Sequence, residues 1–586
     1  MDEDKPYFGI SHCKTVYEFL KIDNEKDTIT LEGYTTLLGI SPEDDVKLYL
    51  RVNGQQDIPC TPVEGRKIST EVLGEVILPA YPFVCTIENV SSYESKGIDI
   101  SLVTEIRGVK FTRRYNLRAG DFFPLGRDFK FSYAEKGGWF IRFGEEEHLI
   151  LTKAEPEAVA AREELLLSEM EKNGEAGKNA VRRRRLARML KPFFKKEIWL
   201  VSDRINKADD NGEALFEYLQ QHEEIDAYFV ISKESVDYER MKEIGKTVDY
   251  LSEEHLLLHL MVDRVVSSSG DGYVMNPFGG ERKFYRDIIS GKQQVFLQHG
   301  ITKDDISAWI NRYEKDFSMI VAAAKPEYDS FMNGVYFYDE KVVKLTGFPR
   351  HDKLKDKGKK QVAIMPTWHD NLLNRANYAK TGEDTLVTDF EDSTHYEFYH
   401  GLLTNEKLLI KAKELGYELL FFPHPRMLPF ASELKPDEQV KVGDFSTQYK
   451  DVFGESSLVV TDYSSVQFDF TYLRKPVIYA HFEQEDFFKG KVYDPGYFDY
   501  ERDGFGEVEY DLEHTVDRII EYMENGCQLK EKYRERIEKF FGFHDRNNCQ
   551  RTFEAIMSLG QPESFTAWQT EEGKDSEKPS LALLSA

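Results

Sequence analysis

Histidines follow two of the apolar segments in the second half of this sequence. His299 and Gly300 come directly after one apolar run, and His424 lies between two prolines after another. A histidine can exchange a proton near neutral pH, and a neighbouring glycine lets the backbone approach a ligand. A histidine at a strand end is more often structural, and a proline-rich turn also explains His424. Both residues are therefore candidates for acid–base chemistry that need support from their surroundings.

Two serines stand where an apolar run gives way to a helical pattern. Ser464 and Ser465 follow the segment SLVVTDY, and Asp469 lies four residues beyond Ser465. Free backbone N–H groups at the start of a helix bind phosphate, and serine hydroxyls add further donors. Serines that only cap a helix need no ligand, so both interpretations stay open. Asp469 falls one turn into the helix, on a face that can also point to the ligand.

Two further apolar runs end in polar residues. These are the segments KLTGFPRHDKL and VAIMPTWHDNL. Because ligands of open α/β sheets bind beyond the carboxyl ends of the strands, four such ends predict one shared cleft. We see no Gly-rich phosphate loop and no set of ligands with metal spacing in this half, so we expect neither a metal nor a cofactor. The possible cleft residues are Lys303, Arg350, Thr367, His369 and Asp370.

Parallel strands alternating with helices must position these residues. Continuous apolar strands between helical stretches indicate parallel sheets covered on both faces. About 360 residues of this pattern exceed one sheet of ordinary size, so we predict an α/β fold with two doubly wound domains. These two Rossmann-like domains, 197–352 and 353–560, would face each other across the cleft. The predicted strands are 198–201, 228–232, 264–268, 294–298, 319–323, 362–365, 419–422, 458–461 and 477–480.

The first part of the chain has a different pattern. Short alternating runs between turn residues predict a small β-rich domain over 1–153, either a sandwich or a barrel. It shows no cluster of His, Cys and carboxylates that indicates chemistry, which favours an accessory role in contacting a partner or polymer. At the other end, 561–586 is rich in Glu, Ser, Lys and Pro and is predicted to be disordered.

A helical, basic linker is predicted over 154–196. The chain of 586 residues has a formal net charge of -27, whereas 178–196 contains nine basic residues and no acidic one. Such a segment binds an anionic membrane surface. A linker helix packed on the next domain explains it equally well, and Pro192 limits a continuous helix. The candidate membrane contacts are Arg182, Arg183, Arg184, Arg185 and Arg188.

Composition argues against several other classes of protein. The negative charge disfavours nucleic acid as a partner. The five cysteines lie far apart and match neither a disulfide framework nor a paired metal motif. The acidic N-terminus lacks the pattern of a secretory signal, and no apolar run reaches about 18 residues. We therefore expect a cytoplasmic protein whose contact with the membrane is peripheral.

The motifs, in their order, resemble those of the CDP-glycerol glycerophosphotransferase family, of the teichoic acid primase and polymerase type. The likeness covers about 198–559 and includes WLVSDR with DNG, the HG pair, GFPRHDKL, the PTW segment, HPRM, and TDYSS with FDF. It implies transfer of glycerol phosphate, or a related polyol phosphate, from a CDP-activated donor to a hydroxyl of a teichoic-acid-like or capsular polymer, with release of CMP. The implied partners are a CDP-polyol donor and a lipid-linked or polymer acceptor at the inner face of the cell membrane.

The resemblance implies a GT-B type fold, in which 197–352 is the acceptor domain and 353–560 is the CDP-donor domain. It also implies roles for individual residues. His299 would be the base that activates the acceptor hydroxyl, and His424 would face the CDP diphosphate in the active site. The implied donor-binding residues are Gly300, Arg426, Thr461, Asp462, Ser464, Ser465 and Asp469.

Two departures from the family pattern leave the polyol and the acceptor open. Lys303 follows the HG pair one residue earlier than the lysine of the polymerase pattern, and TWHD stands in place of TWRD. A nucleotide-sugar glycosyltransferase of the same fold would use the same cleft, and a non-catalytic polymer-binding protein would depend on the β-rich domain. The presence of both histidines and the motif order favour transfer of a polyol phosphate.

Overall fold

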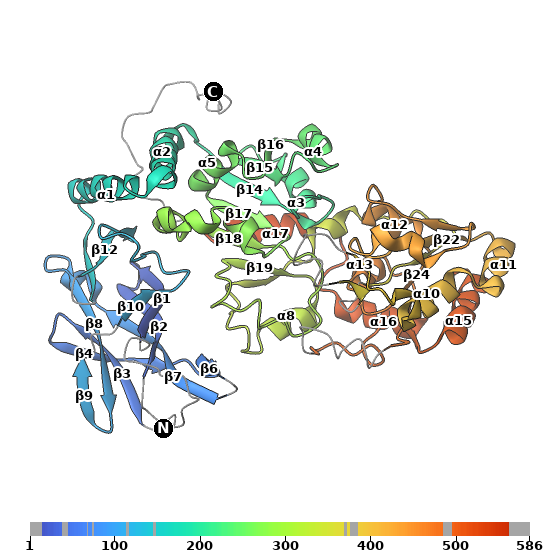
Figure 1. Cartoon of the computed structure of the whole chain (residues 1–586), viewed down its shortest axis with the longest axis horizontal. Coiled ribbons are helices and arrows are strands. Elements are labelled where there is room, and N and C mark those ends of the chain that lie inside the picture. The colour runs from blue at the N-terminus through green and yellow to red at the C-terminus, as the bar shows by residue number, and fades with distance from the viewer. Residues whose placement is uncertain are drawn as a thin grey trace.

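The computed structural model describes residues 14–37, 45–66, 68–72, 75–112, 116–144, 148–367, 372–374, 385–483 and 495–561. A β-rich part, a pair of helices and two α/β halves follow one another along the chain (Figure 1). The tail for which disorder is predicted lies, from residue 562 onward, outside the described residues.

The β-rich part is a sandwich of two sheets. One sheet has the order β10-β1-β2-β7-β5 with β6 on β7, and the other has the order β11-β12-β13-β8-β3-β4 with β9 on β8. Side chains from both sheets, among them Ile29 and Ile100, share one core. The predicted β-rich region is thus confirmed, as a sandwich. Its strands are β1 (Lys14–Asp23), β2 (Thr28–Thr36), β3 (Val46–Val52), β4 (Gln56–Pro59), β5 (Thr61–Pro62), β6 (Ser69–Val72), β7 (Glu75–Glu88), β8 (Ile98–Ile106), β9 (Val109–Thr112), β10 (Asn116–Ala119), β11 (Ala134–Lys136), β12 (Trp139–Phe143) and β13 (Leu149–Lys153).

The N-terminal α/β half contains a parallel sheet with the order β16-β15-β14-β17-β18-β19-β20. Its strands are β14 (Glu197–Ser202), β15 (Ile225–Ile231), β16 (Thr247–Asp249), β17 (Arg264–Ser267), β18 (Gln293–Phe296), β19 (Met319–Ala322) and β20 (Val343–Leu345). Its helices are α3 (Asn211–Leu219), α4 (Tyr238–Ile244), α5 (Glu253–Met261), α6 (Gly272–Met275), α7 (Arg286–Ile289), α8 (Lys325–Phe331) and the 3-10 helix η5 (Pro349–Lys353).

The C-terminal half repeats this plan with the parallel order β23-β22-β21-β24-β25-β26. Its strands are β21 (Gln361–Ile364), β22 (Glu418–Phe421), β23 (Val440–Val442), β24 (Leu458–Thr461), β25 (Val477–Ala480) and β26 (Gly506–Glu509). Its helices are α10 (Thr394–Leu403), α11 (Glu406–Leu415), α12 (Tyr449–Glu455), α13 (Val466–Tyr472), α15 (Leu512–Glu524), α16 (Glu531–Phe540) and α17 (Asn548–Met557).

All nine strands predicted for the α/β halves are confirmed, and both sheets are parallel as expected. The four strands that the sequence did not predict, β16, β20, β23 and β26, are the outermost strands of the two sheets. Each has only three or four residues and includes polar ones. An edge strand is not covered on both sides, so it lacks the continuous apolar run that identifies an interior strand.

The strand orders place a switch in chain direction at the same point of each sheet. The first strand of each half, β14 or β21, lies between a strand that follows it directly and a strand that the chain reaches later, β17 or β24. Ligands of doubly wound sheets bind beyond the carboxyl ends of the strands at this switch point. The residues after β14, β17, β21 and β24 therefore have the position of ligand-binding groups.

The last helix, α17, packs on the N-terminal half, although the predicted division places it in the C-terminal domain (Figure 1). The rings of Trp199 and Phe553 lie 5.9 Å apart. The buried guanidinium of Arg264 donates to the carbonyls of Ile556 and Gly560, at 2.7 Å each. Helix α17 and the residues just after it therefore tie the two halves together.

The basic segment forms most of α2 (Gly174–Leu190), which packs against α1 (Pro156–Glu171). The side chain of Arg184 is 2% exposed, and its guanidinium lies 3.1 Å from Glu163 and 2.7 Å from Asp287. An arginine in this position has no access to lipid, so the prediction of a membrane contact is wrong for Arg184.

The other arginines of α2 differ in exposure. Arg183 is largely covered and pairs with Glu253 and Glu281. Arg182 and Arg185 are mostly exposed, with side-chain exposures of 59% and 57%, and Arg188 is partly exposed. Among the described residues, no helix has the length and apolarity needed to cross a membrane.

Candidate active site between the two halves

A cavity of about 520 Å³ lies between the two α/β halves, and residues from both line it. Three of the predicted site residues do not line this cavity: Arg426, Thr461 and Asp462. His369 and Asp370 lie outside the described residues. The predicted residues that line the cavity are His299, Gly300, Lys303, Arg350, Thr367, His424, Ser464, Ser465 and Asp469.

The loop that carries His299 is fixed by the residues around it. Gln298, buried with φ of 61°, donates from Nε2 to the Val321 carbonyl at 2.6 Å and to Glu327 at 3.0 Å. Glu327 also accepts from the backbone N–H of Thr302 at 2.7 Å. A non-glycine residue in the left-handed region persists only when its surroundings hold it there. The loop is therefore preorganised on both sides of the histidine.

The imidazole of His299 is open to the cavity but otherwise surrounded by protein. Burial in the cavity wall, and then the positive charges of Arg204 and Arg350, lower the pKa of His299 to about 4. Asp271 and a hydrogen bond to the backbone of Ser268 act in the opposite direction. His299 is therefore neutral at physiological pH, which is the state that a general base requires.

His424 faces the same cavity from the C-terminal half. The backbone N–H of Arg426 donates to its Nδ1 at 3.3 Å. The proton of the neutral ring then sits on Nε2, which makes that atom a hydrogen-bond donor. Burial, followed by the charges of Arg204 and Arg426, lowers the pKa of His424 to about 3.

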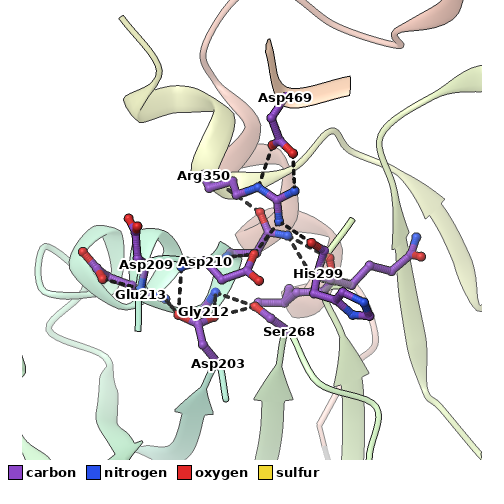
Figure 2. Close-up of polar contacts among 12 residues, drawn as sticks. Asp203, Asp209, Asp210, Gly212, Glu213, Ser268, His299, Arg350 and Asp469 are labelled. Carbon is purple, nitrogen blue, oxygen red and sulfur yellow. Dashed lines mark hydrogen bonds and ion pairs between the residues drawn. The ribbon is translucent and has the colours of Figure 1, made fainter. Parts of the chain in front are cut away.

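Arg350 joins the two halves at one edge of the cavity (Figure 2). Its guanidinium donates to both oxygens of Asp469 at 2.7 and 2.8 Å, to Asp210 and, at 3.1 Å, to the carbonyl of His299. His351 lies 3.0 Å from the same Asp469 carboxylate. We call Arg350, His351, Asp210 and Asp469 the junction.

The carboxylate of Asp469 is engaged within this junction. Burial alone would raise the pKa of Asp469, but Arg350 and His351 hold it well below its usual range. An ionised carboxylate in these contacts would repel an anionic donor. The contacts therefore favour a positioning role over the donor-binding role expected from the sequence.

The DNG motif places α3 against the end of β14 (Figure 2). The carboxylate of Asp203 accepts from the backbone N–H groups of Gly212 at 2.7 Å, Asp210 at 3.1 Å and Glu213 at 3.1 Å. A Cβ at Gly212 would clash with the carbonyl of Ser202. The motif thus requires a glycine because the helix start lies directly on the strand end.

The start of α13 brings the two halves into contact. A Cβ at Gly300 would lie 2.8 Å from Oγ of Ser465, so the glycine permits this approach. Oγ of Ser464 accepts from the N–H of Val466 at 3.4 Å, whereas Ser465 forms no side-chain capping bond. The capping interpretation therefore has support for Ser464 and none for Ser465.

Thr461 and Asp462 hold neighbouring strand ends together. The hydroxyl of Thr461 donates to the carbonyl of Met365 at 2.7 Å. The carboxylate of Asp462 accepts from the N–H of Thr367 at 2.9 and 3.0 Å. Both residues are buried and lie outside the cavity lining. Their contacts therefore favour a structural role over the direct contact with a donor that the sequence predicted.

Among the residues that sequence reasoning missed, Arg204 and Gln298 line the cavity, and Glu327 holds the His299 loop. Arg204 ends the WLVSDR motif, and the rule that ligands bind after strand ends could have identified it. Glu327 follows β19 in the sequence AAAKPE, where proline and glutamate indicate the first turn of a helix. No local signal indicates that Glu327 contacts the His299 loop.

Comparison with known proteins gives a family match over most of the α/β part. Residues 184–558 match the sequence model of the CDP-glycerol:poly(glycerophosphate) glycerophosphotransferase family. The chain is 34% identical over 547 residues to the minor teichoic acid biosynthesis protein GgaB of Bacillus subtilis (strain 168). That alignment covers 92% of this chain and 59% of the relative, so the chain spans less than two thirds of that protein.

Two other proteins are more distant. The teichoic acid glycerol-phosphate transferase of Staphylococcus aureus (strain NCTC 8325 / PS 47) is 21% identical over 380 residues, covering 59% of this chain and 89% of the relative. Among solved structures, the wall teichoic acid polymerase TagF aligns with a TM-score of 0.47 and 15% identity, over 64% of this chain and 93% of that chain.

Proposed function

The chain belongs to the CDP-glycerol:poly(glycerophosphate) glycerophosphotransferase family, and we propose that it transfers glycerol phosphate, or a related polyol phosphate, from a CDP-activated donor to a hydroxyl of a teichoic-acid-like or capsular polymer. One observation carries this proposal. A single cavity holds His299 and His424, from strand ends of opposite halves, together with the serines at the start of α13.

In the proposed reaction, the acceptor hydroxyl attacks the phosphorus that bears the glycerol. A new P–O bond forms to the acceptor, the P–O bond between this phosphorus and CMP breaks, and CMP leaves with the bonding electrons. His299 takes the proton of the hydroxyl, for which its neutral imidazole is suited. Such a transfer needs positioning and charge stabilisation more than covalent chemistry.

The two histidines take different roles in this scheme. Nε2 of His424 carries the proton of the neutral ring, because Nδ1 accepts from the Arg426 backbone. A donor of this kind can bind an oxygen of the donor diphosphate. Ser464 and Ser465 would bind other oxygens at the start of α13. His299 is then the base, and His424 stabilises charge on the leaving side.

The test is a panel of activated donors. The purified protein is incubated with CDP-glycerol, CDP-ribitol and UDP-sugars, with a teichoic-acid-like acceptor present, and the released nucleotide is identified. We expect CMP from a CDP-polyol. UDP from a UDP-sugar would instead identify a nucleotide-sugar glycosyltransferase, and no release from any donor would favour a non-catalytic polymer-binding protein.

We further propose that the enzyme works at the anionic inner surface of the cell membrane, where a lipid-linked acceptor would be presented. The exposed side of α2 carries the remaining candidate contacts, Arg182, Arg185 and Arg188. At about 1 kcal/mol for each charge, replacing all three with glutamine would weaken binding to anionic vesicles by up to about a hundredfold.

Co-sedimentation with vesicles that contain phosphatidylglycerol tests this location. A control variant loses three lysines exposed elsewhere, Lys407, Lys413 and Lys441, through substitution by glutamine. If both variants bind like the wild type, α2 is only a linker helix.

A further inference from the structure

We propose that Arg204 binds the phosphoryl group that the reaction transfers. The identity of that group rests on the proposed function, and the position of the arginine rests on the structure. Arg204 is the second residue after the end of β14, which pairs with β17 at the switch point of the N-terminal sheet. Its side chain is exposed and lines the cavity that also contains His299 and His424.

The backbone of Arg204 is held in place while its side chain stays open. The preceding residue, Asp203, is buried and accepts hydrogen bonds from Gly212 and from the hydroxyl of Ser268. Arg204 itself pairs with Lys207 through a backbone bridge. A side chain that projects from a fixed backbone loses less entropy when it binds a ligand.

Four of the other cations that line the cavity are already engaged. Lys303 lies 2.7 Å from Asp304, Lys353 pairs with Glu217, and Arg350 is held in the junction. Lys450 lies 3.7 and 3.8 Å from two carboxylates. By contrast, no carboxylate of the described residues lies within ion-pair distance of Arg204. Its positive charge is available to an anion that enters the cavity.

Lys207 also lines the cavity and lacks a carboxylate partner among the described residues, but its contacts differ from those of Arg204. Its amino group is 3.4 Å from the carbonyl of Phe445, and its charge acts on Asp209. The charge of Arg204 acts instead on His299 and His424, which belong to opposite halves. Arg204 is therefore the open cation near both histidines.

The chemistry of a guanidinium suits this position. It stays charged at any physiological pH, and its planar N–H groups match two oxygens of a phosphate. In phosphoryl transfer, negative charge is spread over the oxygens of the transferred group, and an arginine placed there contributes about 10³ to 10⁵ in rate. Near the base His299, Arg204 would contact that group rather than the CMP part of the donor.

Steady-state kinetics with CDP-glycerol, and inhibition by CMP, test the assignment. For Arg204→Gln we expect kcat/KM to fall by at least about a hundredfold. The inhibition constant of CMP, which lacks the transferred group, should stay within about threefold of the wild-type value. For Arg204→Lys, kcat/KM should be at least about tenfold higher than for Arg204→Gln. The proposal would be overturned if kcat/KM of Arg204→Gln stayed within about fivefold of wild type, or if the inhibition constant of CMP rose by as much as kcat/KM fell.

Calorimetry with inorganic pyrophosphate tests the cation without turnover. We expect the wild type to bind pyrophosphate, and Arg204→Gln to bind at least about tenfold more weakly. The control Lys353→Gln also removes one positive charge from the cavity lining and should stay within about threefold of wild type. Equal binding by wild type and Arg204→Gln, or no binding by the wild type, would refute the anion site. If pyrophosphate binding behaves as expected but no CMP forms from either CDP-glycerol or CDP-ribitol, the proposed function fails and the anion site stands.

Discussion

The junction lies next to a part of the cavity lining that we call the open face, which contains Arg204 and His299. Both regions contain an arginine and a histidine, but the two arginines differ in whether they are paired. In the junction, Arg350 is engaged by two carboxylates and by a backbone carbonyl (Figure 2). On the open face, Arg204 has no such partner among the described residues, and His299 is open to the cavity with a lowered pKa. Arg350 therefore holds the two halves together, whereas the charge of Arg204 is available to bind an anion.

This difference separates two kinds of residue within the family motifs. A charge that is fully paired in the folded protein holds elements together. A charge or base that is open to a cavity is available for a substrate. The comparison predicts that changes in the junction reduce stability and that changes on the open face reduce activity or binding.

The largest expected effect is on the open face. Replacing His299 with alanine should lower kcat by about 10² to 10⁴, because a positioned general base contributes that much. The midpoint of thermal unfolding should stay near the wild-type value, since His299 is exposed to the cavity. His514→Ala, at an exposed histidine of α15, is the matched control. A turnover within a few-fold of wild type would remove His299 from the mechanism.

In the junction, Arg350→Ala should reduce stability instead. Removing one partner of a buried ion pair leaves an uncompensated charge and costs about 3 to 5 kcal/mol. Denaturant titrations of Arg350→Ala, Asp469→Ala and the double variant measure this cost. The double variant should lose less than the sum of the two single losses. Strict additivity would show that the two side chains do not act as a pair.

A smaller effect is expected at the start of α13. Replacing Ser464 and Ser465 together with alanine should raise the dissociation constant of CDP-glycerol by about tenfold, the loss of about 1.4 kcal/mol of binding. Turnover at saturation should change less, because these groups would bind the ground state and the transition state alike. Isothermal calorimetry measures the constant, and an unchanged value would show that neither serine binds the donor.

The smallest expected effect is the change of kcat/KM with pH, which should be nearly absent around neutral pH. A base with a pKa of about 4 is neutral throughout the range from about pH 6 to 8, so kcat/KM should be flat there. It should fall only as the pH approaches 4 and His299 gains a proton. A histidine with an ordinary pKa of about 6.5 would instead lose about tenfold between pH 7.5 and 5.5. That loss, in a protein shown to stay folded, would contradict the environment described for His299.

The sequence predicted the interior strands, and the positions of His299 and His424 after two of them, because both depend on local signals. An apolar run identifies a strand covered on both sides, and a polar residue after it identifies a strand end. The sequence could not predict that Arg350 pairs with Asp469, which lies 119 residues further along the chain. Such a pair depends on how the two halves dock, and no local pattern encodes it.

The same limit explains the error at Arg184. A run of arginines on a helix looks like a basic surface, and only the docking of α2 shows that one of them faces Glu163 and Asp287. The donor-binding roles expected for Thr461, Asp462 and Asp469 remain predictions, although their hydrogen bonds favour holding the site together. Sequence reasoning identified the strand ends that lie at the cavity. It was less successful in identifying which side chain at each strand end is open to the cavity.

The central claim is that the cavity moves a phosphoryl group rather than a sugar. The most direct test supplies CDP-glycerol labelled in the glycerol, with a polyglycerol phosphate acceptor, and measures labelled polymer and nucleotide together. Our account predicts one CMP for each glycerol phosphate added, with neither product formed by His299→Ala. Release of CDP in place of CMP, or labelled polymer at an undiminished rate from His299→Ala, would contradict it.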